Sequence, residues 1–411
     1  MSTSRPFNID TDLADLHRIW QEIGWMEDSD AHRRGIKAYL DVSTTTAQDV
    51  NGAMDIGVSR CDATVHVQHT TLPACLIAGV YAGLAGRQGG HATRMTAEHV
   101  ADGAAQGAAI ATLGIFDQGF YDRVGFGCGP YVRRMTIEPA SLNVPRLQRS
   151  PVRLTIDDAQ AMHDCRLQRR HLHGAIDIPH VAYTEMECCE SPGWGLGFKN
   201  SAGALTHCMW ITHESKIENG PWSVRWMAWN TRDELMELLG VVKSFADQVS
   251  GVRIADPPGL QMQDLVDRPF AWMRRTGSGE NQVKPTAVAY WQHRMCDVPR
   301  CIGAISMPGA DLRFNVQIDE PIEQFLASDA SWRGCGGDWI ISLGDTCSAE
   351  PGCDDALPTM RASINAFTRW WMGVRSAEAL SMTDAFEAPA ELLAGLTAHY
   401  RLPAPETDWD Y

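Results

Sequence analysis

The sequence VYAGLAGRQGGHA, residues 80–92, indicates the fold of the first part of the chain. It overlaps the end of the apolar run 74–82 and precedes residues 93–106, which are rich in helix-forming residues. The expected local order is a buried strand, a glycine-rich turn and a helix. Glycines in such a turn let consecutive backbone N–H groups point outward, and the helix N-terminus adds partial positive charge. The segment therefore predicts a pyrophosphate site, although a turn that merely joins two elements has the same pattern.

A second motif follows about thirty residues later. The sequence FYDRVGFG covers residues 120–127 and comes after a short apolar strand predicted over residues 108–115. By itself, Tyr121 is better interpreted as a buried packing residue than as a catalytic phenol. The two motifs together, of the forms R-x-x-G-x-A and F-Y-x-R-x-G-F-G, resemble the GNAT superfamily of N-acetyltransferases.

The resemblance extends to one family of that superfamily. The register of residues 80–90 and the spacing IATLGIFDQGFY over residues 110–121 are similar to the actinobacterial Eis (enhanced intracellular survival) family. The stretch DVPRC at 297–301 and the terminal Tyr411 continue the likeness along nearly the whole chain. It implies an enzyme that acetylates aminoglycosides at several amines. It also implies two tandem GNAT-like domains followed by a sterol-carrier-protein-like domain, all in the mixed α/β (α+β) class.

Two polar breaks divide the chain in a way that fits this layout. EPASLNVPRLQRSP at residues 138–151 has a linker-like composition, and a second polar stretch covers residues 274–281. We therefore predict an N-terminal GNAT domain over 1–145, a second GNAT-like domain over 146–288, and a sterol-carrier-like domain over 289–411.

Local patterns inside these units predict individual elements. Apolar residues at helical spacing over 13–23 predict a first helix. Residues 63–68 and 223–229 have strand patterns, and Thr231-x-x-Glu234 is a capping box that opens a helix. In the third unit, residues 312–318 alternate as a strand with one wet face, 339–343 form another strand, and helices are expected near 364–371 and 392–396.

The family resemblance also implies roles for particular residues. Tyr121 is expected to be the general acid that protonates the leaving thiolate, and the α-carboxylate of Tyr411 the base. The acetyl-CoA donor is expected to contact Val80, Ala82, Arg87, Gln88, Gly90 and His91. The amine acceptor is expected to contact Trp25, Glu27, Asp28, Asp30, Trp409 and Asp410.

Two departures from the family pattern leave alternatives open. The family turn usually reads H-R-R-R-G, whereas Arg87 is here the one basic side chain, followed by Gln88 and Gly89. Gly114, Ile115 and Phe116 stand where the family commonly has W/T-A-S. The alternatives are therefore an acyl or imidoyl transferase of antibiotic biosynthesis with a modified or non-CoA donor, and a non-catalytic ligand-binding protein.

Composition and charge limit the partners. The chain has 51 acidic and 35 basic residues, for a formal net charge of −16. Such a charge disfavours broad nucleic-acid binding and attachment to anionic membranes, and it favours cationic small molecules. The family resemblance implies that this cationic partner is an amine-bearing small molecule. No secretory leader is apparent, and the 12 cysteines form no C-x-x-C pair, so we expect a cytoplasmic protein with reduced, mostly buried thiols. The family resemblance implies a homo-oligomer.

No metal site is expected. The histidines and cysteine near residues 163–173 fit no zinc spacing, and three arginines crowd them with positive charge. Cys188 and Cys189 are interpreted as a buried pair in a strand.

Overall fold

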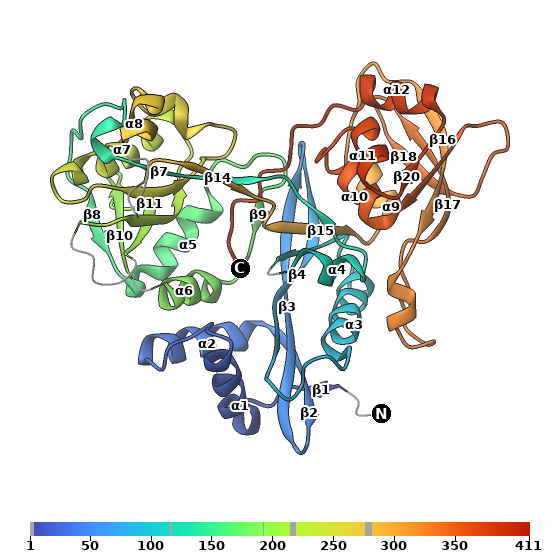
Figure 1. The fold of residues 1–411 in the computed structure, drawn as a ribbon, viewed down its shortest axis with the longest axis horizontal. Coiled ribbons are helices and arrows are strands. Elements are labelled where there is room, and N and C mark those ends of the chain that lie inside the picture. Colours follow the sequence, from blue (N-terminus) through green and yellow to red (C-terminus); the bar gives the residue numbers. More distant parts are fainter. Residues whose placement is uncertain (1–3, 116, 192, 214–218, 276–281) are drawn as a thin grey trace.

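The computed structural model describes residues 4–115, 117–191, 193–213, 219–275 and 282–411. Three β-sheets with accompanying helices form three lobes, with the N-terminal helices at the bottom of Figure 1 and the other two sheets above them on either side. The mixed α/β class predicted from the sequence is confirmed. Phe116 and residues 276–281, which the sequence interpretation used, lie outside the described residues. In the described part of the chain, no helix is both long and apolar enough to cross a bilayer.

The first sheet contains the predicted strand–turn–helix unit. Its order is β1 (Arg5–Pro6), β2 (Thr44–Val50), β3 (Ala53–Val67), β4 (Thr70–Ala82), β5 (Ile110–Gly114), β15 (Trp291–Met295) and β6 (Gly127–Cys128), and β9 (Ile176–Asp177) pairs with β3. Its helices are α1 (Ile9–Glu22), α2 (Asp30–Val42), α3 (His91–Ala105) and the short α4 (Gln118–Asp122). The predicted strand at 74–82 and helix at 93–106 are therefore confirmed as β4 and α3.

Strands β4 and β5 separate after a short parallel ladder. The ladder joins Ala74–Leu76 to Ile110–Thr112 and then stops, although β4 continues to Ala82. Beyond that point β4 stays paired with β3, and β5 stays paired with β15 over its whole length. Backbone polar groups on the facing edges therefore lack ladder partners and are available to a ligand.

The second sheet repeats this separation. Its order is β14 (Pro285–Val288), β7 (Val132–Ile137), β13 (Val252–Ala255), β12 (Trp222–Ala228), β11 (Leu205–His213), β10 (Gly193–Lys199) and β8 (Val152–Leu154). Its helices are α5 (Ala159–Leu167), α6 (Val181–Glu190), α7 (Arg232–Ser244) and α8 (Pro269–Arg275). The parallel ladder between β12 and β13 covers Trp222–Ser223 and Val252–Arg253 only. Cys188 and Cys189 lie in α6, so their assignment to a strand was wrong.

The third sheet has five strands. Its order is β18 (Ser348–Pro351), β17 (Gly337–Leu343), β16 (Leu312–Asp319), β19 (Thr359–Ser363) and β20 (Phe386–Glu387). The accompanying helices are α9 (Val298–Gly303), α10 (Ile364–Trp371), α11 (Ala377–Thr383) and α12 (Ala390–His399). The predicted strands at 312–318 and 339–343 and the helices near 364–371 and 392–396 are confirmed.

The sheets do not follow the predicted domain boundaries at residues 145 and 288. Strand β7 precedes residue 145 but pairs with β13 and β14 in the second sheet. Strand β15 follows residue 288 but lies between β5 and β6 in the first sheet. The lobes are therefore joined by shared strands as well as by connecting segments.

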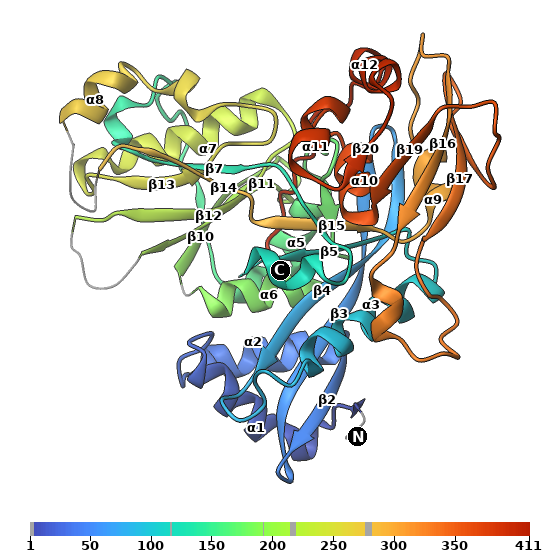
Figure 2. The ribbon, with the colours of Figure 1, turned by 45° about the vertical axis from the view of Figure 1, so that its right-hand side comes forward.

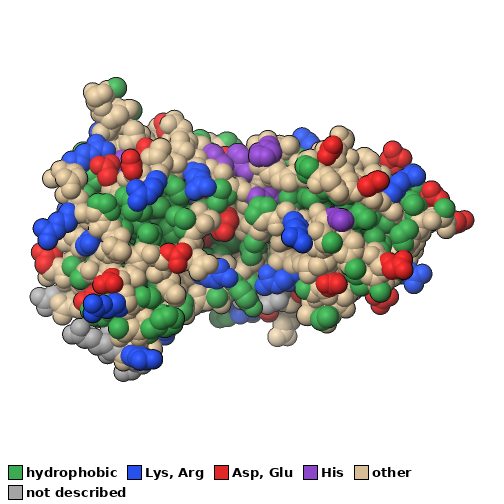
Figure 3. All heavy atoms as spheres, turned by 90° about the horizontal axis from the view of Figure 1, so that it is seen from above, with side chains coloured by type: hydrophobic (Ala, Val, Ile, Leu, Met, Phe, Trp, Pro, Cys, Tyr) green, Lys and Arg blue, Asp and Glu red, His purple; other side chains and the backbone are tan. Residues whose placement is uncertain are grey.

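The C-terminal segment, residues 400–411, leaves α12 without regular structure and returns to the middle of the molecule. Figures 1 and 2 both show the C-terminus beside β15, where the three lobes meet. The face drawn in Figure 3 shows histidines gathered near its middle, with basic and acidic side chains intermixed around them.

Candidate active site

A cavity of about 360 Å³ lies where β4 and β5 separate. Residues 77–80 of β4 and 114–115 at the end of β5 form part of its wall, and Tyr121 and Tyr411 border the same space. Thus the structure brings together Val80, Tyr121, Tyr411, and also the predicted acceptor ligands Trp25 and Asp410. These five positions are separated by up to several hundred residues in the sequence, and the fold gathers them at one cavity.

Tyr121 is held in an apolar setting on α4. Its side chain is 3% exposed, and its ring contacts Phe120 and Phe126 edge-on at centroid distances of 4.9 and 6.2 Å. Burial raises the pKa of the Tyr121 phenol above its usual range, because the phenolate would lose its hydration. The phenol therefore keeps its proton at neutral pH.

The third lobe fixes the connection that follows Tyr121. Asn365 of α10 donates hydrogen bonds to the carbonyls of Asp122 and Phe126 at 2.9 and 2.8 Å. Arg294, fully buried on β15, donates to the Val124 carbonyl at 3.0 Å. Gly125 has φ +88°, and a Cβ there would lie 1.7 Å from Arg294 Nη1. The first glycine of the FYDRVGFG motif is therefore required by close packing against Arg294.

Tyr411 is fixed from two sides. Its hydroxyl and the hydroxyl of Thr112 on β5 are 2.6 Å apart, and its ring packs on Trp291 of β15 at a centroid distance of 4.7 Å. Both contacts come from the first sheet. The last residue of the sequence therefore lies beside the separated strands, near Tyr121.

The turn between β4 and α3 has the features of an anion site. Gly90 is the N-cap residue of α3 with φ +71°, and it supplies no side-chain cap. Gln88 also has positive φ, at 69°, and the first turn of α3 contains no acidic residue. Alternation of right- and left-handed backbone conformations can turn successive N–H groups to one side, and the helix N-terminus favours negative charge there. The side chains of Arg87 and Gln88 are exposed at this turn.

Asp55 supports the start of the turn, a role that the sequence pattern does not indicate. Its carboxylate accepts a hydrogen bond from the Gly86 N–H at 2.5 Å, and its carbonyl accepts one from Gly83 at 2.8 Å. Arg18 of α1 pairs with the same carboxylate at 3.0 Å.

The two residues at the ends of this turn are also placed by the structure. His91 is held at its Nδ1 by the Gln48 side chain at 2.8 Å. Ala82 ends β4 immediately before this turn.

Acidic side chains of the cavity come from α6 and the C-terminal segment. Glu187, Glu190 and Asp410 line it, together with Arg225 of β12. Asp410 and Arg225 are 3.6 Å apart, and Glu187 pairs with Arg166. Among the described residues Glu190 makes no ion pair, so the cavity wall has an excess of negative charge.

Burial modifies these carboxyl groups. It raises the pKa of Glu187 to about 7 against the opposing effect of Arg166. It also raises the pKa of Glu190, with Asp410 contributing in the same direction. The Glu190 side chain lines the cavity and is exposed to solvent there.

Other predicted acceptor ligands lie elsewhere. Glu27, Asp28 and Asp30 are exposed in and next to the connection between α1 and α2, outside the wall of the cavity, and Asp28 pairs with Arg33. Trp409 is fully buried against the Arg166 guanidinium, 3.9 Å from its ring centroid, and is likewise not part of the wall. The sequence interpretation missed Glu187 and Glu190, although their i, i+3 spacing in YTEMECCE was a usable signal.

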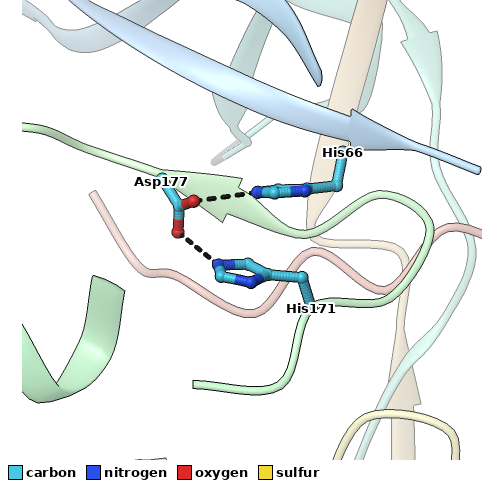
Figure 4. Close-up of side chains that lie close together, drawn as sticks. All are labelled: His66, His171 and Asp177. Carbon is cyan, nitrogen blue, oxygen red and sulfur yellow. Dashed lines mark hydrogen bonds and ion pairs between the residues drawn. The ribbon is translucent and has the colours of Figure 1, made fainter. Parts of the chain in front are cut away.

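A cluster of His66, His171 and Asp177 has donors close enough to suggest a metal site (Figure 4). Both histidine Nε2 atoms bond to the Asp177 carboxylate, at 2.8 and 2.9 Å. The imidazole rings are stacked, with centroids 4.0 Å and planes 20° apart. Nearly parallel rings at this distance do not direct their in-plane lone pairs at one ion, and the Arg169 guanidinium also bonds to Asp177 at 2.7 Å. The cluster therefore has poor geometry and charge for a cation.

Comparison with solved structures identifies the architecture. A probable N-acyltransferase from Enterococcus faecalis V583 superposes with a TM-score of 0.78 at 15% identity, over 100% of both chains. A GCN5-related N-acetyltransferase from Anabaena variabilis gives a TM-score of 0.77 at 13% identity, over 98% of both chains. This chain has the GNAT fold. Eis1 from Mycobacterium abscessus also superposes over 100% of both chains, with a TM-score of 0.75 at 12% identity.

At these identities the likeness concerns the GNAT fold alone. No protein-family model matches the sequence, and no curated protein matches it either. The site assignments therefore rest on the residues of this chain.

Proposed function

We propose that this protein is an N-acyltransferase of the Eis-like type, which moves an acetyl group from acetyl-CoA to an amine of a cationic polyamino compound. One observation carries the proposal. Tyr121, Tyr411 and the edge of β4 beyond its ladder with β5 border a single cavity, and β4 continues through the turn at 83–90 into a helix whose N-terminus has no side-chain cap.

Coenzyme A, the donor of the acetyl group, would be held mainly by backbone groups of the protein. The pyrophosphate would contact the turn at Arg87, Gln88, Gly90 and His91, where N–H groups and the helix N-terminus favour an anion. The pantetheine arm and acyl carbonyl would contact the β4 backbone at Val80 and Ala82, beyond the end of the β5 ladder. With one arginine at this turn, binding would rest on backbone donors more than on side-chain charge.

The chemistry is a direct transfer. An ammonium has no lone pair, so the acceptor amine must lose a proton, and a carboxylate such as the terminal group of Tyr411 can accept it directly or through a water molecule. The amine nitrogen then bonds to the acyl carbon, and the carbon–sulfur bond breaks. Tyr121 donates its hydrogen bond and then its proton to the departing thiolate, so the products are an amide and a free thiol.

The charge of the cavity supports a cationic acceptor. Glu190 makes no ion pair within the described chain, and Asp410 shares the wall with it. Trp20, Trp25 and Trp226 add aromatic faces, which attract ammonium groups. An aminoglycoside or a related antibiotic has this chemistry, and the third lobe would be the sterol-carrier-like unit of the same family. A homo-oligomer is part of the same proposal.

The test measures thiol release from acetyl-CoA with a panel of polyamines and aminoglycosides. We expect release with at least one acceptor, and loss of most of it when two residues are added after Tyr411. Calorimetry with acetyl-CoA gives the binding step separately. Absence of both binding and thiol release would overturn the proposal. Binding of acetyl-CoA with normal turnover in the extended chain would remove only the terminal carboxylate from the mechanism.

A further inference from the structure

The C-terminal segment reaches the cavity without a helix or strand of its own. From Tyr400 onward it has no regular structure, yet Trp409 is 0% exposed. Among the described residues, one backbone–backbone hydrogen bond, from the Glu406 N–H to the His173 carbonyl at 2.7 Å, ties residues 401–411 to the rest of the molecule. Side chains must therefore supply most of the order of this segment.

Arg169 provides the densest set of these contacts. All five of its N–H groups have acceptors. The Nε–H donates to Asp408 Oδ2 at 2.7 Å, and Nη2 donates to Asp408 Oδ1 at 2.6 Å. The remaining groups donate to Asp177 Oδ1 and the Arg166 carbonyl, both at 2.7 Å, and to the Ile176 carbonyl at 2.6 Å. A guanidinium is suited to such a junction because its donors are planar and fixed in direction.

The other side of the junction is anchored to the first sheet. Asp177 lies on β9, which pairs with β3, and its carboxylate also bonds to His66 of β3 and to His171 (Figure 4). Arg169 itself is buried, with a side chain 5% exposed. The Arg169 guanidinium thus lies between two carboxylates. Asp177 ties it to the first lobe, and the guanidinium in turn holds Asp408 of the C-terminal segment.

We propose that Arg169 is a positioning residue that fixes Tyr411 in the cavity by holding Asp408, three residues earlier. The inference rests on the proposed function for its catalytic meaning. Three residues of extended chain span about 10 Å, and without the Asp408 anchor only the packing of Trp409 and the contacts of the Tyr411 ring and hydroxyl would hold the end of the chain at the cavity. With Asp408 held at one end and the Tyr411 hydroxyl beside Thr112 at the other, the two residues between them have little freedom.

The variant that tests this is Arg169→Gln, with Arg170→Gln as the matched control. Arg170 is the neighbouring arginine, it is exposed, and within the described chain it forms no ion pair. In Arg169→Gln we expect kcat to fall about 10- to 100-fold, with the KM for acetyl-CoA changed by less than about twofold, because the α3 turn is untouched. In Arg170→Gln both constants should remain within about twofold of the wild type.

Two further measurements separate positioning from a general loss of structure. In a chain that ends at Trp409, adding Arg169→Gln should lower kcat by less than about twofold, since the residue it positions has been removed. Hydrogen exchange of the Glu406 amide, which is bonded to the His173 carbonyl, should become at least about tenfold faster in Arg169→Gln while β3 and β4 are unchanged.

Other outcomes have distinct meanings. An equal loss of kcat in the shortened chain, or unchanged exchange of the Glu406 amide, would overturn the positioning role. If Arg169→Gln does not fold, Asp408→Asn leaves Arg169 paired with Asp177, and the same two outcomes decide. If the wild type transfers no acetyl group, the proposed function fails, and the exchange experiment still tests the anchor.

Discussion

The first and second sheets contain the same strand separation but use it differently. In each, a parallel pair splits after a short ladder, β4 from β5 and β12 from β13. The first opening is a cavity of about 360 Å³ that ends at Tyr121. The second is a cavity of about 150 Å³ whose wall includes residues 405–408 of the C-terminal segment. The chain's own C-terminal segment therefore borders both openings and narrows the second.

The helices that follow the two strands differ as well. Helix α3 begins at Gly90 without a side-chain cap, whereas α7 begins at Thr231, which forms a reciprocal capping box with Glu234. Asp233 and Glu234 also place negative charge in the first turn of α7. A side-chain cap takes up the free N–H groups of a helix start, and acidic side chains there repel phosphate. The start of α3, beside the first opening, therefore favours an anion, and the start of α7, beside the second opening, disfavours one.

The largest expected difference between the two openings is catalytic. Tyr121→Phe should lower kcat by about 10²- to 10⁴-fold, because the departing sulfur loses its proton donor, while acetyl-CoA affinity stays nearly constant. Tyr131→Phe makes the same chemical change in the second opening, where Tyr131 is 55% exposed, and should leave kcat unchanged. Steady-state kinetics of both variants checks this. Equal activities would remove Tyr121 from the mechanism.

The packing of the FYDRVGFG motif should appear as a stability difference. Gly125→Ala must accommodate both φ +88° and a Cβ 1.7 Å from the Arg294 guanidinium, so we expect a loss of about 1–3 kcal/mol in unfolding free energy. Gly119→Ala, in the same region, meets no atom within 4 Å and is the control. Denaturant titration of the two variants compares them, and a tolerated Gly125→Ala would contradict the packing argument.

Acidic charge can be exchanged between the two helix starts. Ala92→Asp gives α3 the charge that Asp233 gives α7 at the corresponding second helical position. Near a bound pyrophosphate this should weaken acetyl-CoA binding by about three- to tenfold, which corresponds to about 0.6–1.4 kcal/mol. Asp233→Ala in α7 should have no effect on that affinity. Calorimetry distinguishes the two, and tighter binding or a second bound equivalent of acetyl-CoA in Asp233→Ala would show that the second opening also takes the donor.

The smallest effect concerns β15, which lies between the openings. Burial lowers the pKa of His293 on this strand to about 4, against about 6.5 in an unfolded chain. Below pH 6.5 the unfolded state therefore binds a proton that the folded state refuses, and stability falls as pH decreases. From pH 7 to pH 6 this group contributes about 0.7 kcal/mol of that loss. Denaturant midpoints of His293→Gln across this range should be less pH-dependent than those of the wild type, and an equal dependence would contradict the argument.

The sequence predicted the elements whose information is local. The apolar run before the glycine turn, the capping box at Thr231 and the alternation of residues 312–318 each correspond to the observed element within a few residues. Tyr121 and Tyr411 were selected from the family resemblance, and the fold places both at one cavity.

Features that depend on distant pairing could not be predicted in this way. The placement of β15 between β5 and β6 has no local signature, because the sequence of a strand does not name its neighbours. Glu187 and Glu190 were missed because the segment containing Cys188 and Cys189 was interpreted as a strand, which hid their helical spacing. The roles of Asp55 and Arg169 depend on contacts across 31 and 239 positions of the chain.

The position of β15 also constrains how the protein can be made. Until residues 291–295 have left the ribosome, β5 has an open edge on the side that β15 later covers. Such an edge can pair with other nascent chains, so the N-terminal lobe is exposed to aggregation until residues 291–295 have been made. Expressed alone, residues 1–145 would retain that open edge, and aggregation of this fragment is the expected result.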